Sequence, residues 1–292
     1  MNIWGIRMKS HAFMVGFAAL MVISGGAQAQ ETIRFAVGPY QPTPEDTQKA
    51  FEPFFRYVAG KLGMKYEVRA TTEQAGVAVA LGAAQADAAW MGPWGYVLAN
   101  NRSGVNVIAT VKYDGQPFYH SIVVGKPGLP IKNWPQDAKG MSMSFANASS
   151  TSGWLIPHFW YMQRGIDPRT FFNYREGSTH AAQQVAVISG QVQLATDYDR
   201  NRRAMIDSGR IPENLSHVYW TSDPLPNDAF AVRKGLDPKL VQRLQDILVS
   251  IDEATAKAVM PQHYTGWIKS DHSNYKMIED AGLAIGAIKK GP

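Results

Sequence analysis

The sequence predicts an α/β fold built of two lobes, and three observations support this. From residue 33 onward, apolar segments of strand length alternate with segments whose apolar residues recur at helical spacing. Such alternation is typical of sheets whose strands are joined by crossover helices. The pattern then repeats in the middle of the chain, and 292 residues are enough for two modest cores.

The expected elements follow from the position of each apolar segment. Expected strands cover residues 33–38, 64–70, 87–90, 105–112, 121–124, 141–145, 192–196, 218–221 and 229–233. Expected helices cover residues 46–62, 73–84, 152–164, 181–189 and 238–258, and the alternation indicates mostly parallel strands. We expect the chain to cross between the lobes near residues 109–124 and 219–233. A small ligand is then expected between the lobes, at the carboxyl ends of the strands.

The N-terminus has the features of a cleavable secretory signal peptide. Arg7 and Lys9 precede an apolar run over residues 12–23, and Ala27 and Ala29 supply the small residues of a cleavage site. We expect residues 1–29 to be removed after Ala29, which places the mature chain in the periplasm. An uncleaved membrane anchor is the alternative, but the run is shorter than the ~18 residues that span a bilayer.

Composition narrows the function classes. The chain has no cysteine, so disulfides, a lipid-modified cysteine and cysteine metal sites are excluded. The formal charge of +5 falls to +3 once Arg7 and Lys9 leave with the signal peptide. No run of Lys or Arg occurs, which disfavours nucleic-acid binding, and the mild positive charge suits an anionic ligand.

A run of hydroxyl residues is the strongest local signal. Ser149, Ser150, Thr151 and Ser152 lie between an expected strand and an expected helix, directly before Gly153. The first turn of a helix has unpaired N–H groups and a partial positive charge, so added hydroxyl donors make a seat for a tetrahedral oxyanion. Simple capping of the helix by one hydroxyl is the alternative.

Five motifs, taken in order, carry a family resemblance over about residues 33–270. They are Gln85–Trp90, Asp114–Ser121, Ser150–Pro157, His180–Val192 and Leu225–Lys234. Together they resemble the periplasmic phosphonate-, phosphite- and phosphate-binding proteins of ABC importers. The resemblance implies a two-lobe periplasmic-binding-protein fold of type II, in which each lobe is a mixed sheet flanked by helices. We expect residues 30–115 and 225–292 to form one lobe and residues 116–224 to form the other.

The resemblance also implies which residues bind the ligand. The Ser150–Ser152 run would hold the phosphorus-bound oxygens, with His180 contacting the same oxygens. Asp228 would contribute a carboxylate to the cleft, and Tyr119 belongs to a further matching motif. Where binders of 2-aminoethylphosphonate carry a glutamate, this chain has Asp197 and Asp199 nearby, so its amine-binding carboxylates do not follow from the resemblance. Asp197 is a candidate contact for a ligand amine; the alternative is that these acidic residues begin a helix.

Two departures from the family pattern concern ligand choice. Gln74 and Met91 stand where binders of 2-aminoethylphosphonate carry tyrosine. We expect Met91, Trp90, Trp94 and Tyr40 to form a partly apolar pocket wall. Such a wall favours phosphite, hypophosphite or methylphosphonate, because a further phosphate oxygen would be left without a partner at a cost of ~1–3 kcal/mol. Core packing of Met91 and the tryptophans is the alternative.

Two other groups of side chains suggest no separate site. Arg200, Arg202 and Arg203 are expected on a solvated helix face, and the alternative is that they face an anion. The histidines outside the motifs lack metal-ligand spacing, so no metal and no cofactor are expected.

The predicted function is that of a non-enzymatic binding component, a monomer that delivers a small anion to an inner-membrane ABC permease. The alternatives are a binder of 2-aminoethylphosphonate, phosphate or another anion, and a periplasmic input to a sensor. An enzyme on the same fold is a further alternative, although the sequence has no G-x-S-x-G or H-E-x-x-H motif.

Overall fold

A computed structural model describes residues 1–2 and 31–289 of the chain. The expected signal peptide and its cleavage point after Ala29 therefore lie, apart from the first two residues, outside the described residues. Within the described part, no helix is both long and apolar enough to cross a membrane.

A six-stranded sheet has the strand order β13–β4–β12–β3–β1–β2. Its strands are β1 (Thr32–Val37), β2 (Lys65–Ala70), β3 (Ala88–Met91), β4 (Asn106–Tyr113), β12 (Ala229–Val232) and β13 (Tyr264–Lys269). Strand β1 pairs in parallel with β2 and β3, whereas β12 and β13 run antiparallel to their partners. The C-terminal part of the chain thus completes a sheet that the N-terminal part begins.

A five-stranded sheet has the strand order β10–β6–β9–β7–β8. Its strands are β6 (Ser121–Gly125), β7 (Ser142–Ala146), β8 (Asn173–Ser178), β9 (Leu194–Tyr198) and β10 (His217–Thr221). Strand β7 is parallel to β8 and β9, and β6 is antiparallel to β9 and β10. Both sheets are therefore mixed, as the family resemblance implied. The expectation of mostly parallel strands is not met, because β6 in one sheet and β12 and β13 in the other run opposite to their neighbours, so that four strand pairs of these two sheets are parallel and five are antiparallel.

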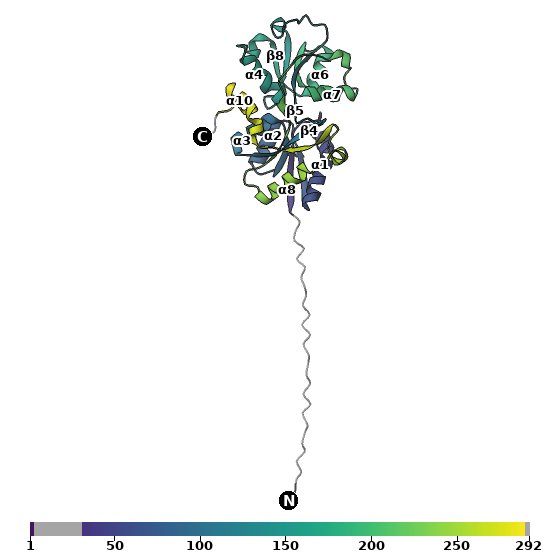
Figure 1. Cartoon of the computed structure of the whole chain (residues 1–292), viewed down its shortest axis with the longest axis vertical. Helices are drawn as coiled ribbons and strands as arrows, with labels where there is room; N and C mark the ends of the chain where they lie inside the picture. Colours follow the sequence, from purple (N-terminus) through teal and green to yellow (C-terminus); the bar gives the residue numbers. More distant parts are fainter. Residues whose placement is uncertain (3–30, 290–292) are drawn as a thin grey trace. The chain divides into compact units, whose positions relative to one another are not determined.

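Helices flank both sheets. They are α1 (Pro44–Leu62), α2 (Gln74–Gly82), α3 (Pro93–Ser103), α4 (Ile156–Met162), α5 (Pro168–Phe171), α6 (His180–Ser189), α7 (Asp199–Asp207), α8 (Pro238–Val249), α9 (Glu253–Val259) and α10 (Lys276–Ala284). A π-helical turn, η2 (Thr151–Leu155), precedes α4, and short 3₁₀ turns are η1 (Gln136–Ala138), η3 (Glu213–Leu215) and η4 (His272–Tyr275). Figure 1 shows α4, α6 and α7 beside the five-stranded sheet, and α1, α2 and α8 beside the six-stranded sheet.

Two connections join the sheets. The first runs from β4 to β6 through β5 (Phe118–Tyr119), and the second runs from β10 to β12 through β11 (Leu225–Pro226). Strands β5 and β11 pair with each other, with Tyr119 opposite Leu225. The two connections are therefore tied side by side.

Helix α1 shows how local sequence fixes an element that supports the site. The side chain of Thr43 accepts a hydrogen bond from the Asp46 N–H at its start, and Gly63 ends it at φ 71°. Its buried face includes Phe51 and Phe54, whose rings contact the Trp90 ring with centroid separations of 4.8 and 5.1 Å. This core holds the ends of β1 and β3 in place.

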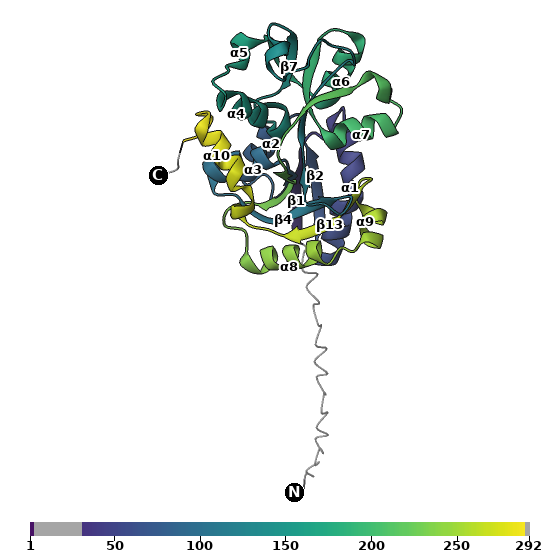
Figure 2. The ribbon, with the colours of Figure 1, turned by 45° about the horizontal axis from the view of Figure 1, so that its top comes forward.

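The sequence located every expected strand to within two residues of its observed ends. It missed α3, β8 and β13, and it joined α8 and α9, which the structure separates at Ser250–Asp252, where Asp252 caps the second helix. The C-terminal stretch packs onto the fold: Tyr264–Lys269 forms β13 and Tyr275 is buried. Figure 2 shows α10 lying beside α3 and α4.

Candidate functional site

A small cavity of about 70 Å³ lies where strand ends and helix starts from both sheets meet. Its lining residues are Pro39, Tyr40, Gln74, Gly92, Pro93, Tyr119, Asn147, Ser150, Thr151, Ser152, His180, Tyr198, Arg200 and Asp228. Gln74, His180 and Arg200 each lie in the first turn of a helix that follows a strand. The structure therefore brings together eight of the twelve side chains singled out from the sequence.

The hydroxyl run forms one wall of this cavity. Ser150 is the N-cap of the π-helical turn, and its Oγ accepts a hydrogen bond from the Gly153 N–H at 3.1 Å. Thr151 Oγ1 accepts from the Trp94 N–H at 2.8 Å. The backbone carbonyl of Ser152 accepts a hydrogen bond from Ser121 Oγ at 2.6 Å, which fixes the turn to the start of β6. Capping and an oxyanion seat are thus compatible: Ser150 caps the turn, and all three hydroxyl residues line the cavity.

His180 is held against this wall. Its Nε2 lies 3.0 Å from Ser150 Oγ, and its Nδ1 lies 3.1 Å from Asp197 Oδ1. Asp197 is fully buried and accepts hydrogen bonds from Gln184 and Asn201. It does not line the cavity, so the structure corrects its expected ligand contact: the Asp197 oxygens accept from protein amides, and His180 Nδ1 lies close to Asp197 without completing a hydrogen bond.

The Asp197, His180 and Ser150 side chains follow the same order as a hydrolase triad. Ser150 Oγ, however, is fixed as a helix cap by the Gly153 N–H. The arrangement therefore holds donors in place around the cavity, which suits binding of an oxyanion.

The opposite wall comes from the six-stranded sheet. Gln74 Oε1 accepts a hydrogen bond from the Gly92 N–H at 3.0 Å, so its amide N–H groups remain as the donors it can offer. A Cβ at Gly38 would lie 2.4 Å from Gln74 Nε2, so glycine at this position makes room for the glutamine. Tyr40 lines the same wall, and burial raises the pKa of its hydroxyl well above the ordinary value.

Asp228 is the one carboxylate that lines the small cavity within the described chain. It follows β11, is 5% exposed, and its Oδ2 accepts a hydrogen bond from Trp90 Nε1 at 3.3 Å. Burial raises the pKa of the Asp228 carboxyl, and the charge of Arg200 offsets part of that effect. Tyr119 faces it from β5, and burial also raises the pKa of the Tyr119 hydroxyl. That phenol stays a neutral donor beside Thr151 and Ser152.

The apolar wall expected from Met91, Trp90 and Trp94 is not found. Each of the three side chains is at most 1% exposed, and none lines the cavity. Trp90 and Met91 are consecutive residues of β3, so they enter the cores on opposite faces of the sheet. Beyond the strand end, Gly92 and Pro93 reach the cavity instead.

Trp94 has a different role from the one expected. Its Nε1 donates to the Ala148 carbonyl at 3.1 Å, and its backbone N–H donates to Thr151 Oγ1. Trp94 belongs to α3, beside the six-stranded sheet, whereas Ala148 and Thr151 follow β7 of the five-stranded sheet. Trp94 therefore ties the two lobes together at the rim of the site.

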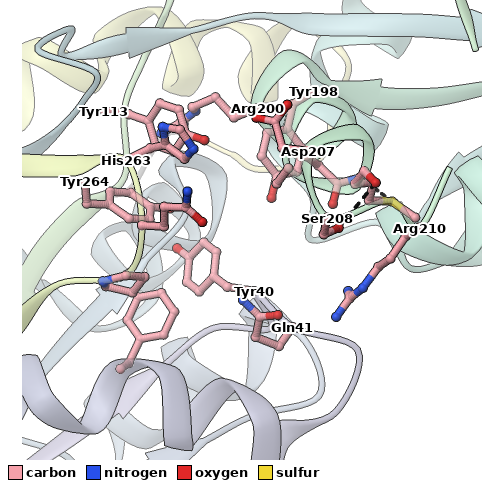
Figure 3. A pocket seen from close by; sticks show the side chains of 16 residues that line it. Tyr40, Gln41, Tyr113, Tyr198, Arg200, Asp207, Ser208, Arg210, His263 and Tyr264 are labelled. Atoms are coloured by element: carbon pink, nitrogen blue, oxygen red, sulfur yellow. Dashed lines mark hydrogen bonds between the residues drawn. The ribbon is translucent and has the colours of Figure 1, made fainter. Parts of the chain in front are cut away.

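A larger cavity of about 310 Å³ adjoins the small one, and Tyr40, Tyr198 and Arg200 line both (Figure 3). Arg200 is 8% exposed, which corrects its expected place on a solvated helix face. Its guanidinium lies 4.8 Å from the centre of the Tyr113 ring and 4.7 Å from that of Tyr119. The sequence could not reveal this, because these rings come from separate strands. Arg202 and Arg203 instead bond Ser216 and Asp207.

Among the described residues, no group of three or more histidine and carboxylate side chains is placed to hold a metal ion. The chemistry available to the cavity is therefore that of hydroxyl, imidazole, amide and guanidinium donors, with one carboxyl group.

Two lobes joined by a paired connection, with a small cavity lined by polar donors at the strand ends between them, define a periplasmic solute-binding protein of type II. A family model described as the periplasmic phosphonate substrate-binding protein of ABC transporters matches residues 35–275, and the chain belongs to this family. Its members are transport components and not enzymes.

Individual relatives support the same class. The chain is 25% identical to the phosphonates-binding periplasmic protein of Escherichia coli over 274 residues, covering 91% of this chain and 80% of that protein. It is 25% identical to a phosphate-import protein of Mycolicibacterium smegmatis, covering 74% and 70% of the two chains. A solved structure of PhnD1 from Prochlorococcus marinus in complex with methylphosphonate has a TM-score of 0.78, with 17% identity over 88% of this chain and 99% of that one.

Proposed function

We propose that this protein captures phosphite, hypophosphite or methylphosphonate in the small cavity and delivers it to an ABC permease. The observation that carries the proposal is the size and lining of that cavity. About 70 Å³ suits a ligand of a few non-hydrogen atoms, and hydroxyl, imidazole and amide donors surround it. The ligand oxygens would lie against Ser150–Ser152 and His180.

The non-polar part of the ligand would face Pro39, Gly92 and Pro93, which take the place of the expected methionine and tryptophan wall. A P–H or P–CH3 group needs no partner there. The fourth oxygen of phosphate would lie against these non-polar groups and be left unpaired, at a cost of ~1–3 kcal/mol. This corresponds to roughly tenfold to hundredfold selectivity.

Binders of ammonium-bearing phosphonates need carboxylates around the amine. Here Asp228 is the one carboxylate that the described lining provides, since Asp197 is enclosed by protein donors. We therefore place 2-aminoethylphosphonate below the three smaller ligands.

We also propose how the chain is processed and divided. Cleavage after Ala29 would release the mature chain into the periplasm as a monomer. Residues 30–115 with 225–292 would move as one lobe and 116–224 as the other, about the paired β5 and β11. Intact mass of the periplasmic protein tests the cleavage point, and a start other than Gln30 would contradict it.

Calorimetry tests the ligand directly. Protein purified from the periplasm after expression of the full chain is titrated with phosphite, hypophosphite, methylphosphonate, 2-aminoethylphosphonate and phosphate. We expect at least one of the first three to bind roughly tenfold or more tightly than phosphate. Preference for phosphate or for 2-aminoethylphosphonate would overturn the ligand assignment and leave the family intact.

A further inference from the structure

We propose that Arg200 binds the ligand directly: its guanidinium donates to an anionic oxygen of the bound phosphorus compound and selects against ligands with a cationic tail. This inference rests on the proposed function and adds to it a residue that lies outside the hydroxyl turn. It also assigns a positive charge to a site otherwise built of neutral donors and histidine.

The first observation is that Arg200 is buried without a counter-ion in contact. It is 8% exposed, and no ion pair joins it to any carboxylate of residues 31–289. Its Nη2 donates to Asn227 Oδ1 at 2.5 Å. Its Nε and Nη1 are buried and have no hydrogen-bond partner within the described part of the chain. Two donors of a fixed, planar cation are therefore left for something that is not protein.

The second observation is what holds the side chain in place. The ring centres of Tyr113, Tyr119 and Tyr198 lie 4.8, 4.7 and 5.9 Å from its guanidinium carbon. Figure 3 shows Arg200 with Tyr113 and Tyr198. Contacts of this kind attract a cation but accept no hydrogen bond in the plane of the guanidinium. These three tyrosine rings therefore orient the Arg200 side chain but leave its Nε and Nη1 donors without a hydrogen-bond acceptor. A buried charge left in this state is costly, and an anion in reach would relieve that cost.

The third observation is the position of Arg200 in the lining of the small cavity. Arg200 lines the small cavity together with Ser150–Ser152 and His180, and it is the one lysine or arginine in the described lining. The hydroxyl turn and Arg200 belong to different strand–helix junctions of the same lobe, so an oxyanion between them can be bound by both. A guanidinium offers directional hydrogen bonds to phosphorus-bound oxygens.

Selectivity follows from the same charge. A ligand with an ammonium tail would bring a second cation into a cavity that already holds a guanidinium without a contact ion pair, and Asp228 is the one lining carboxyl that could offset both charges. Arg200 therefore favours compact anions such as phosphite and methylphosphonate over 2-aminoethylphosphonate.

The test compares Arg200→Met with Arg203→Met. Both substitutions remove one arginine from α7, but Arg203 is solvent-exposed and pairs with Asp207. Titration calorimetry with phosphite, methylphosphonate and 2-aminoethylphosphonate gives the affinities, and thermal melting without ligand gives the stability. We expect Arg200→Met to weaken phosphite and methylphosphonate binding about thirtyfold or more. We expect a smaller loss for 2-aminoethylphosphonate. Arg203→Met should stay within about twofold of the wild type, because exposed charges contribute little.

Melting separates ligand binding from a structural role. If Arg200 serves mainly to bind an anion, the ligand-free Tm of Arg200→Met stays close to that of the wild type, because the lost contacts to Asn227 and the tyrosine rings are offset by removal of a buried charge that has no contact ion pair. A clear drop in that Tm, or a failure to fold, would overturn the inference. So would unchanged phosphite and methylphosphonate affinity in Arg200→Met. If the wild type binds none of the ligands, the proposed function fails, and the two ligand-free Tm values still decide whether Arg200 is structural.

Discussion

At the scale of single residues, the site combines fixed donors with one buried carboxyl group. Asp228 faces Arg200, Tyr40, Tyr119 and Trp90. Burial favours its neutral form, and a neutral carboxyl can donate to a ligand oxygen. An ionised Asp228 would instead repel an anion, so the protonation of this residue should influence ligand binding.

Asp228→Asn tests this directly. The raised pKa means that the stabilising contribution of Asp228 is fully present below its unfolded pKa and is lost as pH rises through its folded pKa. The affinity of the wild type for hypophosphite, whose own charge is constant near neutral pH, should fall as the pH rises through the folded pKa of Asp228. In Asp228→Asn this part of the pH dependence of both affinity and stability should disappear. Calorimetry and melting across pH measure both, and parallel profiles for the two proteins would contradict the account.

At the scale of elements, the strand–helix alternation located the junction after β7 where the hydroxyl residues lie. The structure places Ser150, Thr151 and Ser152 in the lining of the small cavity, in a π-helical turn rather than the expected α-helix start, and their role as an oxyanion seat stays a prediction. The sequence could not show that Met91 faces a core while Gly92 and Pro93 reach the cavity, because that depends on which sheet face each core covers. Helix α3 was not predicted, although Pro93 after Gly92 is a favourable first residue for a helix.

Gly153→Ala tests how closely this turn is packed. An added Cβ would lie 2.3 Å from Ala146 Cβ and 2.7 Å from His180 Cε1, so the turn or the imidazole must move. We expect a loss of about 1–3 kcal/mol in unfolding free energy and a marked loss of ligand affinity.

Gly60→Ala is the matched control for this substitution. Gly60 is exposed in α1, and an added Cβ there meets nothing within 4 Å. We expect this variant to gain about 0.5–1 kcal/mol in stability with unchanged affinity. Denaturant unfolding and calorimetry measure the pair, and equal behaviour of the two variants would show that Gly153 is not tightly enclosed.

At the scale of the whole molecule, the two-lobe fold and its crossings could be predicted because alternation and motif order are spread along the chain. The cavity around Arg200 could not, since Tyr113, Tyr119 and Tyr198 converge on it only after both lobes have formed. Binding by lobe closure requires contacts across the lobes, and Trp94 supplies two of them.

Trp94→Phe removes the Nε1 donor that bonds Ala148 and keeps an aromatic ring. Loss of one hydrogen bond across the lobes, about 0.5–1.5 kcal/mol, predicts roughly threefold to tenfold weaker ligand binding. Trp134→Phe is the control, because the Trp134 Nε1 has no partner among the described residues and lies within one lobe. Calorimetry compares them, and equal affinities would exclude a role for Trp94 in closure.

The most direct test of the account is the affinity of Ser152→Ala for the tightest of the five titrated ligands. Ser152 lines the cavity at 3% exposed, whereas Ser144 in β7 is equally buried at 4% and lies away from it, which makes Ser144→Ala the matched control. Loss of a hydrogen bond to a charged ligand, about 1.5–3 kcal/mol, predicts binding weaker by roughly tenfold to hundredfold in Ser152→Ala alone. Equal affinity of both variants and the wild type would contradict the claim that the hydroxyl turn holds the phosphorus oxyanion.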